Sequence, residues 1–155
     1  MRKPFTVGRV LELMREPLQL ELLSDDAGLS REILSSEVSS PGLVLAGYVD
    51  RFPAHRVLVF GETEMTYLAS LTPTRRRKVL ELFFSFKVPC IVVTKGQSVP
   101  EEMLQASRAR GVPILRNSLK TTEFYARVKP AIAEEFSPTT TLHGSLADVY
   151  GVGLL

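Results

Sequence analysis

Short apolar runs alternate with segments of helical periodicity along the centre of the chain, and this alternation limits the possible folds more than any other feature. Three runs carry the pattern: Leu43 to Tyr48, Arg56 to Phe60 and Cys90 to Thr94. A fourth, shorter run spans Val112 to Leu115. Such runs are typical of buried strands, and the helical segments between them supply the crossovers of a parallel sheet. The sequence therefore predicts an α/β fold with a small, mainly parallel sheet flanked by helices.

Two of the helices between the runs are marked by residues that favour helix ends. The first is predicted to open at Thr72 and Pro73, a capping residue followed by proline. The second is predicted to start at Ser98, because Glu101 follows three residues later and completes a capping-box pattern. Gly111 is predicted to end that helix, since glycine is the usual residue just beyond a helix C-terminus.

The remaining segments predict two more helices and two extended stretches. A helix is expected over Val7 to Met14, followed by extended segments at Leu18 to Leu22 and Ile33 to Val38. The last helix is expected over Thr121 to Glu135, and Pro130 within it predicts a kink or a break.

Composition places the chain among folded proteins and excludes several classes of function. Hydrophobic residues make up 45% of the 155 residues and charged residues 23%, which is ordinary for one globular domain. The formal net charge of +2 is too small to indicate a nucleic-acid partner. The basic run Arg75 to Lys78 is accordingly interpreted as a solvated helix face. No apolar stretch is long enough for a membrane span or a signal peptide, so the cytoplasm is the expected location.

Catalytic and metal-binding motifs are scarce in the sequence. It contains no CxxC, HExxH or GxSxG pattern and no complete phosphate-binding loop, so neither a metal nor a cofactor is expected for the chain itself. The single cysteine, Cys90, lies in an apolar run and is interpreted as a buried strand residue rather than a nucleophile. His55 lies just before another apolar run and is interpreted as a surface loop residue.

Four segments, in the same order, resemble the HPr kinase/phosphorylase family. They are Ser40 to Tyr48 (SPGLVLAGY), Arg56 to Leu68 (RVLVFGETEMTYL), Val88 to Thr94 (VPCIVVT), and His143-Gly144 with Asp148 to Leu155 (DVYGVGLL). In this family the last segment is a strand that leads into a Walker-type phosphate loop, and the sequence ends at Leu155, just before the place of that loop.

The resemblance implies a two-part organisation and a parent enzyme. Residues 1–136 are expected to form an N-terminal accessory domain, and residues 137–155 a linker and the first strand of a missing kinase domain. The parent is expected to be a cytoplasmic homohexamer that uses ATP and Mg²⁺ to phosphorylate a serine of HPr, the carrier protein of the phosphotransferase system, and also removes that phosphate. His143 matches an active-site histidine of the family, which would act only with the missing domain. The fragment alone is expected to be inactive and to serve assembly or regulation.

Two positions depart from the pattern of the resembled family. Ser40 stands where that family usually has arginine, and Glu62 stands where it often has lysine. Both differences lower the local positive charge, so an anionic effector at these positions would be bound weakly or differently.

A ligand site is a second hypothesis, based on the predicted architecture. In open parallel sheets, ligands bind outside the carboxyl ends of the strands. The loops at this edge would hold Gly61, Thr63 and Glu64 after one strand, and Lys95 and Gly96 after the next. Each loop can also be read as an ordinary turn. The alternative function is therefore a free-standing regulatory module that binds a small ligand such as a nucleotide. A third hypothesis, an independent enzyme that uses His143, lacks an identifiable second catalytic group.

Overall fold

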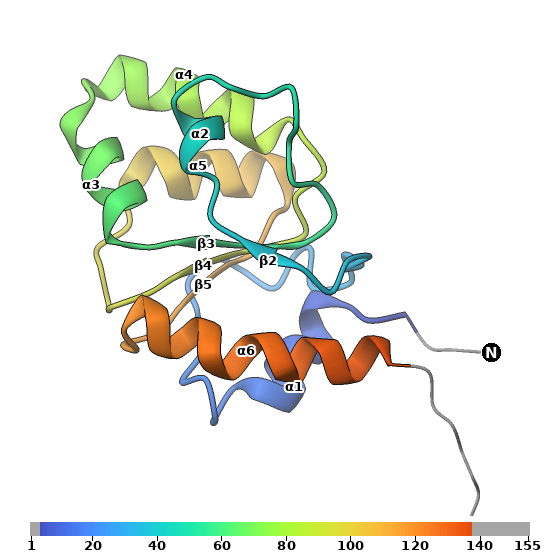
Figure 1. Ribbon diagram of the computed structural model, residues 1–155. Helices are drawn as coiled ribbons and strands as arrows, with labels where there is room; N and C mark the ends of the chain where they lie inside the picture. The colour runs from blue at the N-terminus through green and yellow to red at the C-terminus, as the bar shows by residue number, and fades with distance from the viewer. Residues whose placement is uncertain (1–3, 138–155) are drawn as a thin grey trace, which may run out of the picture.

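A five-stranded sheet lies between two layers of helices in the computed structural model, which describes residues 4–137 (Figure 1). The strands are β1 (Glu21–Leu22), β2 (Val38–Ser39), β3 (Val57–Phe60), β4 (Ile91–Val93) and β5 (Ile114–Arg116), in the spatial order β1-β5-β4-β3-β2. Strands β2 to β5 are parallel, and only β1 runs antiparallel to its neighbour β5. The predicted α/β fold with a mainly parallel sheet is confirmed.

Alternate residues of the central strands face two separate hydrophobic cores. Leu58, Ile91 and Ile114 are paired across β3, β4 and β5 and belong to one core. Their chain neighbours Val92 and Leu115 belong to the other core. All of these residues are buried, because helices cover both faces of the sheet.

The helices divide unequally between the two faces (Figure 1). One face carries α2 (Gly42–Leu45), α3 (Glu62–Ser70), α4 (Pro73–Phe84) and α5 (Glu101–Arg110), whose apolar residues fill one core. The other face carries α1 (Val7–Met14) and α6 (Thr121–Phe136), whose apolar residues fill the other core. The connection from β5 to α6 therefore crosses to the opposite face from the earlier connections. This crossing brings the start of α6 past the carboxyl ends of the strands.

Most of the predicted helix boundaries agree with the structure. The hydroxyl of Thr72 accepts a hydrogen bond from the amide of Arg75 at 3.2 Å, so it caps α4 as expected. Gly111 ends α5 in a left-handed conformation with φ +64°. The capping box at Ser98 is wrong, because α5 begins only at Glu101 and has no side-chain cap. Pro100 in an extended conformation directly precedes it and sets the helix start instead.

The predicted strand at residues 43–48 is also wrong, since this segment forms the short helix α2. Val44 and Leu45 are buried, but Leu43 is 71% exposed and Tyr48 is 50% exposed. The run is therefore amphipathic rather than buried on both faces, and the place beside β3 is taken by Val38 and Ser39. A short apolar run does not by itself distinguish a strand from a helix turn.

Helix α6 continues through Pro130 without the predicted break. Proline removes the hydrogen bond that residue 130 would donate to the carbonyl of Ala126. Both residues lie on the exposed face of the helix, where water can bind that carbonyl. The predicted length of this helix, in contrast, is confirmed.

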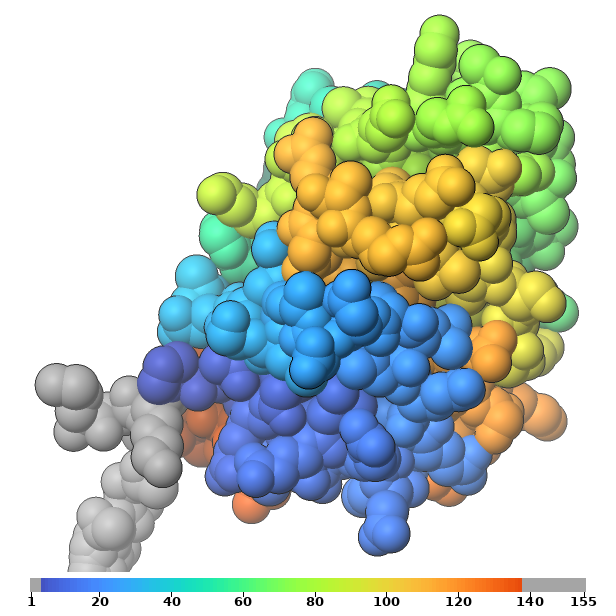
Figure 2. Space-filling view, turned by 180° about the vertical axis from the view of Figure 1, so that it is seen from behind, coloured from blue at the N-terminus to red at the C-terminus, as the bar shows by residue number. Residues whose placement is uncertain are grey.

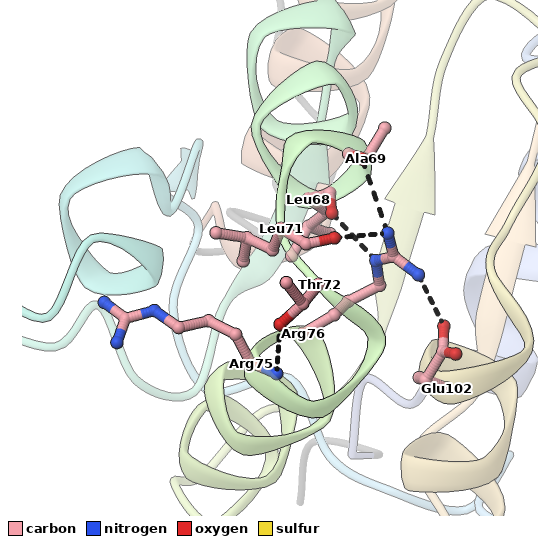
Figure 3. Close-up of polar contacts among 7 residues, drawn as sticks. All are labelled: Leu68, Ala69, Leu71, Thr72, Arg75, Arg76 and Glu102. Atoms are coloured by element: carbon pink, nitrogen blue, oxygen red, sulfur yellow. Dashed lines mark hydrogen bonds and ion pairs between the residues drawn. The ribbon is translucent and has the colours of Figure 1, made fainter.

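Arg76 joins three helices through its guanidinium group (Figure 3). Its Nε donates to the carbonyl of Leu68 at 2.8 Å, and its Nη2 donates to the carbonyls of Leu71 at 2.8 Å and Ala69 at 3.4 Å. Its Nη1 donates to Glu102 Oε1 at 3.1 Å. We call Arg76, its carbonyl acceptors and Glu102 the arginine clasp, because they tie the end of α3 to α4 and α5.

The rest of the basic run is solvated, as predicted. Arg75, Arg77 and Lys78 are exposed, whereas the side chains of Arg76 and Glu102 are only 15% and 17% exposed. Figure 3 shows the side chain of Arg75 directed away from the clasp. Between residues 4 and 137, no helix has the length and apolar character needed to cross a bilayer.

The loop after β1 packs against the end of α5, as the space-filling view shows (Figure 2). The guanidinium of Arg31 donates to the carbonyl of Val88 at 3.2 Å and to that of Arg110 at 3.4 Å. The backbone of Gly28 approaches that of Gly111 so closely that a Cβ atom would lie 2.0 Å from the Gly111 oxygen. This loop is therefore held by backbone contacts that leave no room for a side chain at position 28.

Candidate functional site

The carboxyl ends of all four parallel strands meet around an open hollow of about 410 Å³, which we call the strand-end hollow. Its lining consists of polar residues and one glycine: Ser40, Gly61, Glu62, Thr63, Glu64, Lys95, Lys120, Thr121 and Thr122. These residues follow β2, β3, β4 and β5, respectively, in chain order. The edge of the sheet at which ligands bind in related architectures is thus hollow and polar here.

The sequence-based candidates fall largely into this hollow. Gly61, Thr63, Glu64 and Lys95 all line it, although they come from two different loops. Gly96 lies next to Lys95 but outside the lining, and its left-handed backbone, φ +60°, serves the turn after β4. Ligand binding by these residues stays a prediction.

Glu64 is the most buried charged group of the strand-end hollow. It is only 8% exposed, and its Oε1 accepts a hydrogen bond from the backbone amide of Gly61 at 2.8 Å. The carboxylate also lies in the first turn of α3, where the helix dipole stabilises negative charge. Its second oxygen, Oε2, has no hydrogen-bond partner among residues 4–137. Oε1 therefore has a structural role, whereas Oε2 is not among the buried oxygens without a partner and is reached by solvent.

Two hydroxyl pairs tie α6 to the strand ends. Thr94 Oγ1 and Thr121 Oγ1 share a hydrogen bond of 2.7 Å, and Ser40 Oγ and the Tyr125 hydroxyl share one of 2.8 Å. Partial burial raises the pKa of Tyr125, the hydrogen bond with Ser40 lowers it, and the negative charge of Glu64 raises it. These contacts fix the N-terminal half of α6 beside the hollow.

Two lysines bring positive charge to the rim of the hollow. Lys95 has a left-handed backbone, φ +61°, and its amide donates to the carbonyl of Leu119 at 2.9 Å. Its Nζ lies 3.1 Å from Glu62 Oε1, but both side chains are largely solvated, so this ion pair is weak. Lys120 immediately precedes α6, and its side chain does not cap the helix. No side chain at the N-cap position therefore accepts a hydrogen bond from the amides of the first turn of α6.

The two positions that depart from the resembled family pattern both line the hollow. Ser40 bonds Tyr125, and the carboxylate of Glu62 lies beside Lys95. The hollow consequently combines two carboxylates with two ammonium groups. A ligand that carries both hydrogen-bond donors and negative charge would match this lining better than a simple anion.

Sequence reasoning missed the third part of the site, Lys120 to Thr122. These residues come after the fourth apolar run, but four residues separate Leu115 from Lys120, whereas Gly61 and Lys95 follow the second and third runs directly. The rule that ligands bind at the carboxyl ends of strands applies to this strand as well, but the distance along the sequence hid the link between it and Lys120. Their position beside Gly61 depends on the crossing of α6 to the other face.

The other sequence candidates lie elsewhere. His55 is an exposed loop residue with φ +65°, which confirms its interpretation as a surface residue. His143 lies outside the described residues, as does nearly all of the predicted linker and strand at 137–155. Between residues 4 and 137, no group of three or more histidine, cysteine or acidic side chains is placed to hold a metal ion.

A second hollow, of about 830 Å³, lies on the other side of the molecule between the start of α1 and the end of α6. Its charged lining residues are Arg9, Glu12, Glu32 and Glu135, and Arg9 pairs with Glu12 at 3.0 Å. The strand-end hollow is the better candidate in spite of its smaller volume, because amides, hydroxyls and ammonium groups converge there.

Cys90 should not react while the protein is folded. The residue is fully buried, and this burial raises the pKa of its thiol to about 12, although the nearby charge of Arg31 acts in the opposite direction. Because only the thiolate is nucleophilic, a disulfide reagent at pH 8 should label the native chain only as fast as it unfolds. Absorbance of the released thiolate with and without urea measures this. Rapid labelling of the native chain would contradict the burial of Cys90.

Comparison with known proteins identifies the family. A family model described as HPr serine kinase N terminus matches residues 6–132. The chain is 44% identical over 140 residues to HPr kinase/phosphorylase from Bacillus cytotoxicus, and 42% identical over 140 residues to the enzyme of that name from Bacillus cereus. Each match covers 90% of this chain but 45% of the relative, so the chain spans about half the length of these proteins.

A solved structure shares the fold at low sequence identity. It contains the CBS and DRTGG domains of the regulatory region of Clostridium perfringens pyrophosphatase, in complex with the activator diadenosine tetraphosphate. The TM-score is 0.56 at 9% identity, and the match covers 79% of this chain and 47% of that chain. This likeness concerns the fold alone. With a family model that matches most of its length and relatives above 40% identity, the chain belongs to the HPr serine kinase N-terminal family.

Proposed function

We propose that this chain is the assembly and regulatory half of a bifunctional enzyme that phosphorylates a serine of HPr and removes that phosphate again, in carbon catabolite regulation. The observation that carries the proposal is the 42–44% identity to relatives named HPr kinase/phosphorylase over 90% of the chain. The parent would be a cytoplasmic homohexamer that uses ATP and Mg²⁺. HPr would bind to the kinase half of the parent rather than to this domain.

On its own, the domain is proposed to transfer no phosphate. Phosphoryl transfer depends on a loop whose amides and lysine hold the nucleotide phosphates and whose hydroxyl binds Mg²⁺. The 155-residue sequence contains no such loop. His143 would contribute to the reaction only where a kinase half supplies the remaining groups.

A reconstitution assay tests this proposal. The chain, incubated with HPr, ATP and Mg²⁺, should give no phosphoserine by mass spectrometry, whereas a parent polypeptide with its kinase half should phosphorylate HPr. In the parent, His143→Ala should slow phosphorylation by about 10²-fold or more, the usual contribution of a general acid or base, while His55→Ala should leave the rate unchanged. Phosphoserine formed by the chain alone, or a gene continuation without a Gly-x-Ser-Gly-x-Gly-Lys-Ser loop, would contradict the proposal.

A second candidate function is the binding of a small regulatory ligand. It is favoured by the convergence of four strand ends on one polar hollow, the usual location of ligands in this architecture. The solved structure of similar fold is a regulatory region in complex with an activating nucleotide. This is an analogy of fold alone, and it supports a regulatory role for this chain only as an analogy. A ligand that binds the folded state alone would raise the thermal midpoint of the chain.

A further inference from the structure

The second hollow, between the start of α1 and the end of α6, exposes apolar surface. Leu34 lines it and is 55% exposed, although its chain neighbour Ile33 is buried in the core beneath α1 and α6. Phe136 is only partly buried, and its ring meets that of Phe5 edge to face at a centroid distance of 5.7 Å. Apolar residues that gather around a hollow, rather than lie scattered over the surface, are typical of a contact surface.

The charged groups of the second hollow are mostly acidic and only partly paired. Glu12, Glu32 and Glu135 line it together with Arg9, whose guanidinium pairs with Glu12 at 3.0 Å. Within residues 4–137, neither Glu32 nor Glu135 has an ion-pair partner. Two such carboxylates beside an apolar surface favour a partner that presents an apolar side chain flanked by lysine or arginine.

The place of the second hollow at the end of α6 limits which part of the parent can reach it. Phe136 ends α6 and lines the hollow, and the segment that resembles the start of the kinase half begins seven positions further on, at His143. Seven residues span no more than about 25 Å even when fully extended. Because a small domain is itself about 30 Å across, a kinase half joined by this connector would have to lie beside the end of α6.

We propose that the second hollow is the surface on which the kinase half of the parent docks, with an apolar side chain against Leu34 and a basic residue near Glu32 and Glu135. This inference rests on the proposed function, which supplies the kinase half. A second copy of the chain fits less well, because a symmetric contact would bring the same carboxylates together. Docking would remove the backbone around Leu34 and the start of α1 from solvent.

Hydrogen exchange followed by mass spectrometry tests the proposal on the 155-residue chain and on a parent polypeptide that includes its kinase half. Peptides from residues 4–9 and 31–36 should exchange at least about tenfold more slowly in the parent. Peptides from α4, which lies on the opposite face of the sheet, should exchange equally in both proteins (Figure 1).

Three results would overturn the inference. The first is equal exchange around the second hollow in the chain and in the parent. The second is a slowing of α4 by the same factor, which would show a general stabilisation rather than a docking surface. The third is protection of the hollow in the chain alone that rises with its concentration, since this would assign the surface to a second copy.

Variants of the parent identify the contacts. Leu34→Asp should remove most of the protection, because it replaces the apolar contact with another negative charge on an acidic surface. The double change Glu32→Lys and Glu135→Lys should reduce the protection by about threefold or more, since it places like charges against the basic partner. Leu82→Asp is the matched control, because Leu82 is 44% exposed but lies on α4. Full protection in Leu34→Asp would overturn the proposed contact.

These measurements follow exchange rather than catalysis, so they fail separately from the proposed function. A parent that phosphorylates HPr but leaves the second hollow unprotected would overturn the docking surface and leave the proposed function intact. A parent that protects the hollow but does not phosphorylate HPr would support the docking surface and contradict the proposed activity.

Discussion

Replacing Arg76 with alanine should lower the free energy of unfolding by about 2–3 kcal/mol, because the change leaves several partly buried acceptors without their charged donor. At the end of α3, the carbonyls of Leu68 and Leu71 each accept a hydrogen bond of 2.8 Å from the guanidinium. The Leu68 oxygen also accepts one from the Leu71 amide at 3.2 Å, so the Leu71 oxygen depends most on Arg76. No small side chain can reach them. The expected loss is a large part of the 5–15 kcal/mol that stabilises a typical domain.

The matched control is Arg75→Ala, one residue earlier in the same helix. The side chain of Arg75 is directed into solvent in Figure 3, so its removal should change the unfolding free energy by no more than about 0.5 kcal/mol. Urea unfolding followed by circular dichroism measures both variants. Arg76→Lys should recover little of the loss, because one ammonium cannot serve both the carbonyls and Glu102. Equal stability of the two alanine variants would show that the clasp is not formed.

The arginine clasp also predicts that the free energy of unfolding depends on pH. The hydrogen bond from Arg76 is the main cause that lowers the pKa of Glu102. A carboxyl with a lowered pKa in the folded state stabilises the fold above its unfolded pKa, and this stabilisation is lost as the pH falls through the folded value. The difference in stability between the unaltered chain and Arg76→Ala should therefore narrow below about pH 4. It should not vanish, since the bonds to carbonyls do not titrate.

The arginine clasp illustrates what the sequence could not show. Four consecutive basic residues open α4, and a solvated face was the reasonable prediction for all of them. Which one turns inward is decided by Glu102, 26 residues further along the chain, and by the end of α3. Both partners are known only when the helices are packed. Local pattern therefore predicted the helix and missed its strongest polar contact.

The same distinction between local and tertiary information explains the strands and the site. Val57–Phe60 and Ile91–Val93 were predicted because strands covered on both faces are apolar throughout. Residues 43–48 have a similar composition, but the place beside β3 is taken by Val38 and Ser39, at the end of the extended segment predicted for Ile33 to Val38. Likewise, the loops that carry Gly61 and Lys95 were predicted to lie at the ligand-binding edge because each follows a strand. Thr121 comes close to Thr94 at this edge only because α6 crosses to the other face of the sheet.

Replacing Gly28 with alanine should destabilise the fold by about 3 kcal/mol or more, through a clash and a backbone preference that act together. The residue has φ +91°, a conformation that alanine disfavours, and an added Cβ would lie 2.0 Å from the Gly111 oxygen. This oxygen belongs to the backbone at the end of α5, so no change of rotamer relieves the contact. The loop would have to withdraw, which would also weaken the bonds from Arg31 to Val88 and Arg110.

Gly47→Ala separates the two contributions, because Gly47 shares the backbone preference without the clash. Its φ is +110°, and nothing lies within 4 Å of the position of an added Cβ. Alanine there should reduce the free energy of unfolding by about 1–2 kcal/mol, the cost of a left-handed backbone alone. The difference between the two variants in urea unfolding then measures the closeness of the loop to α5. If Gly28→Ala is as stable as Gly47→Ala, the loop adapts without loss, and the contact between Gly28 and Gly111 does not hold it in place.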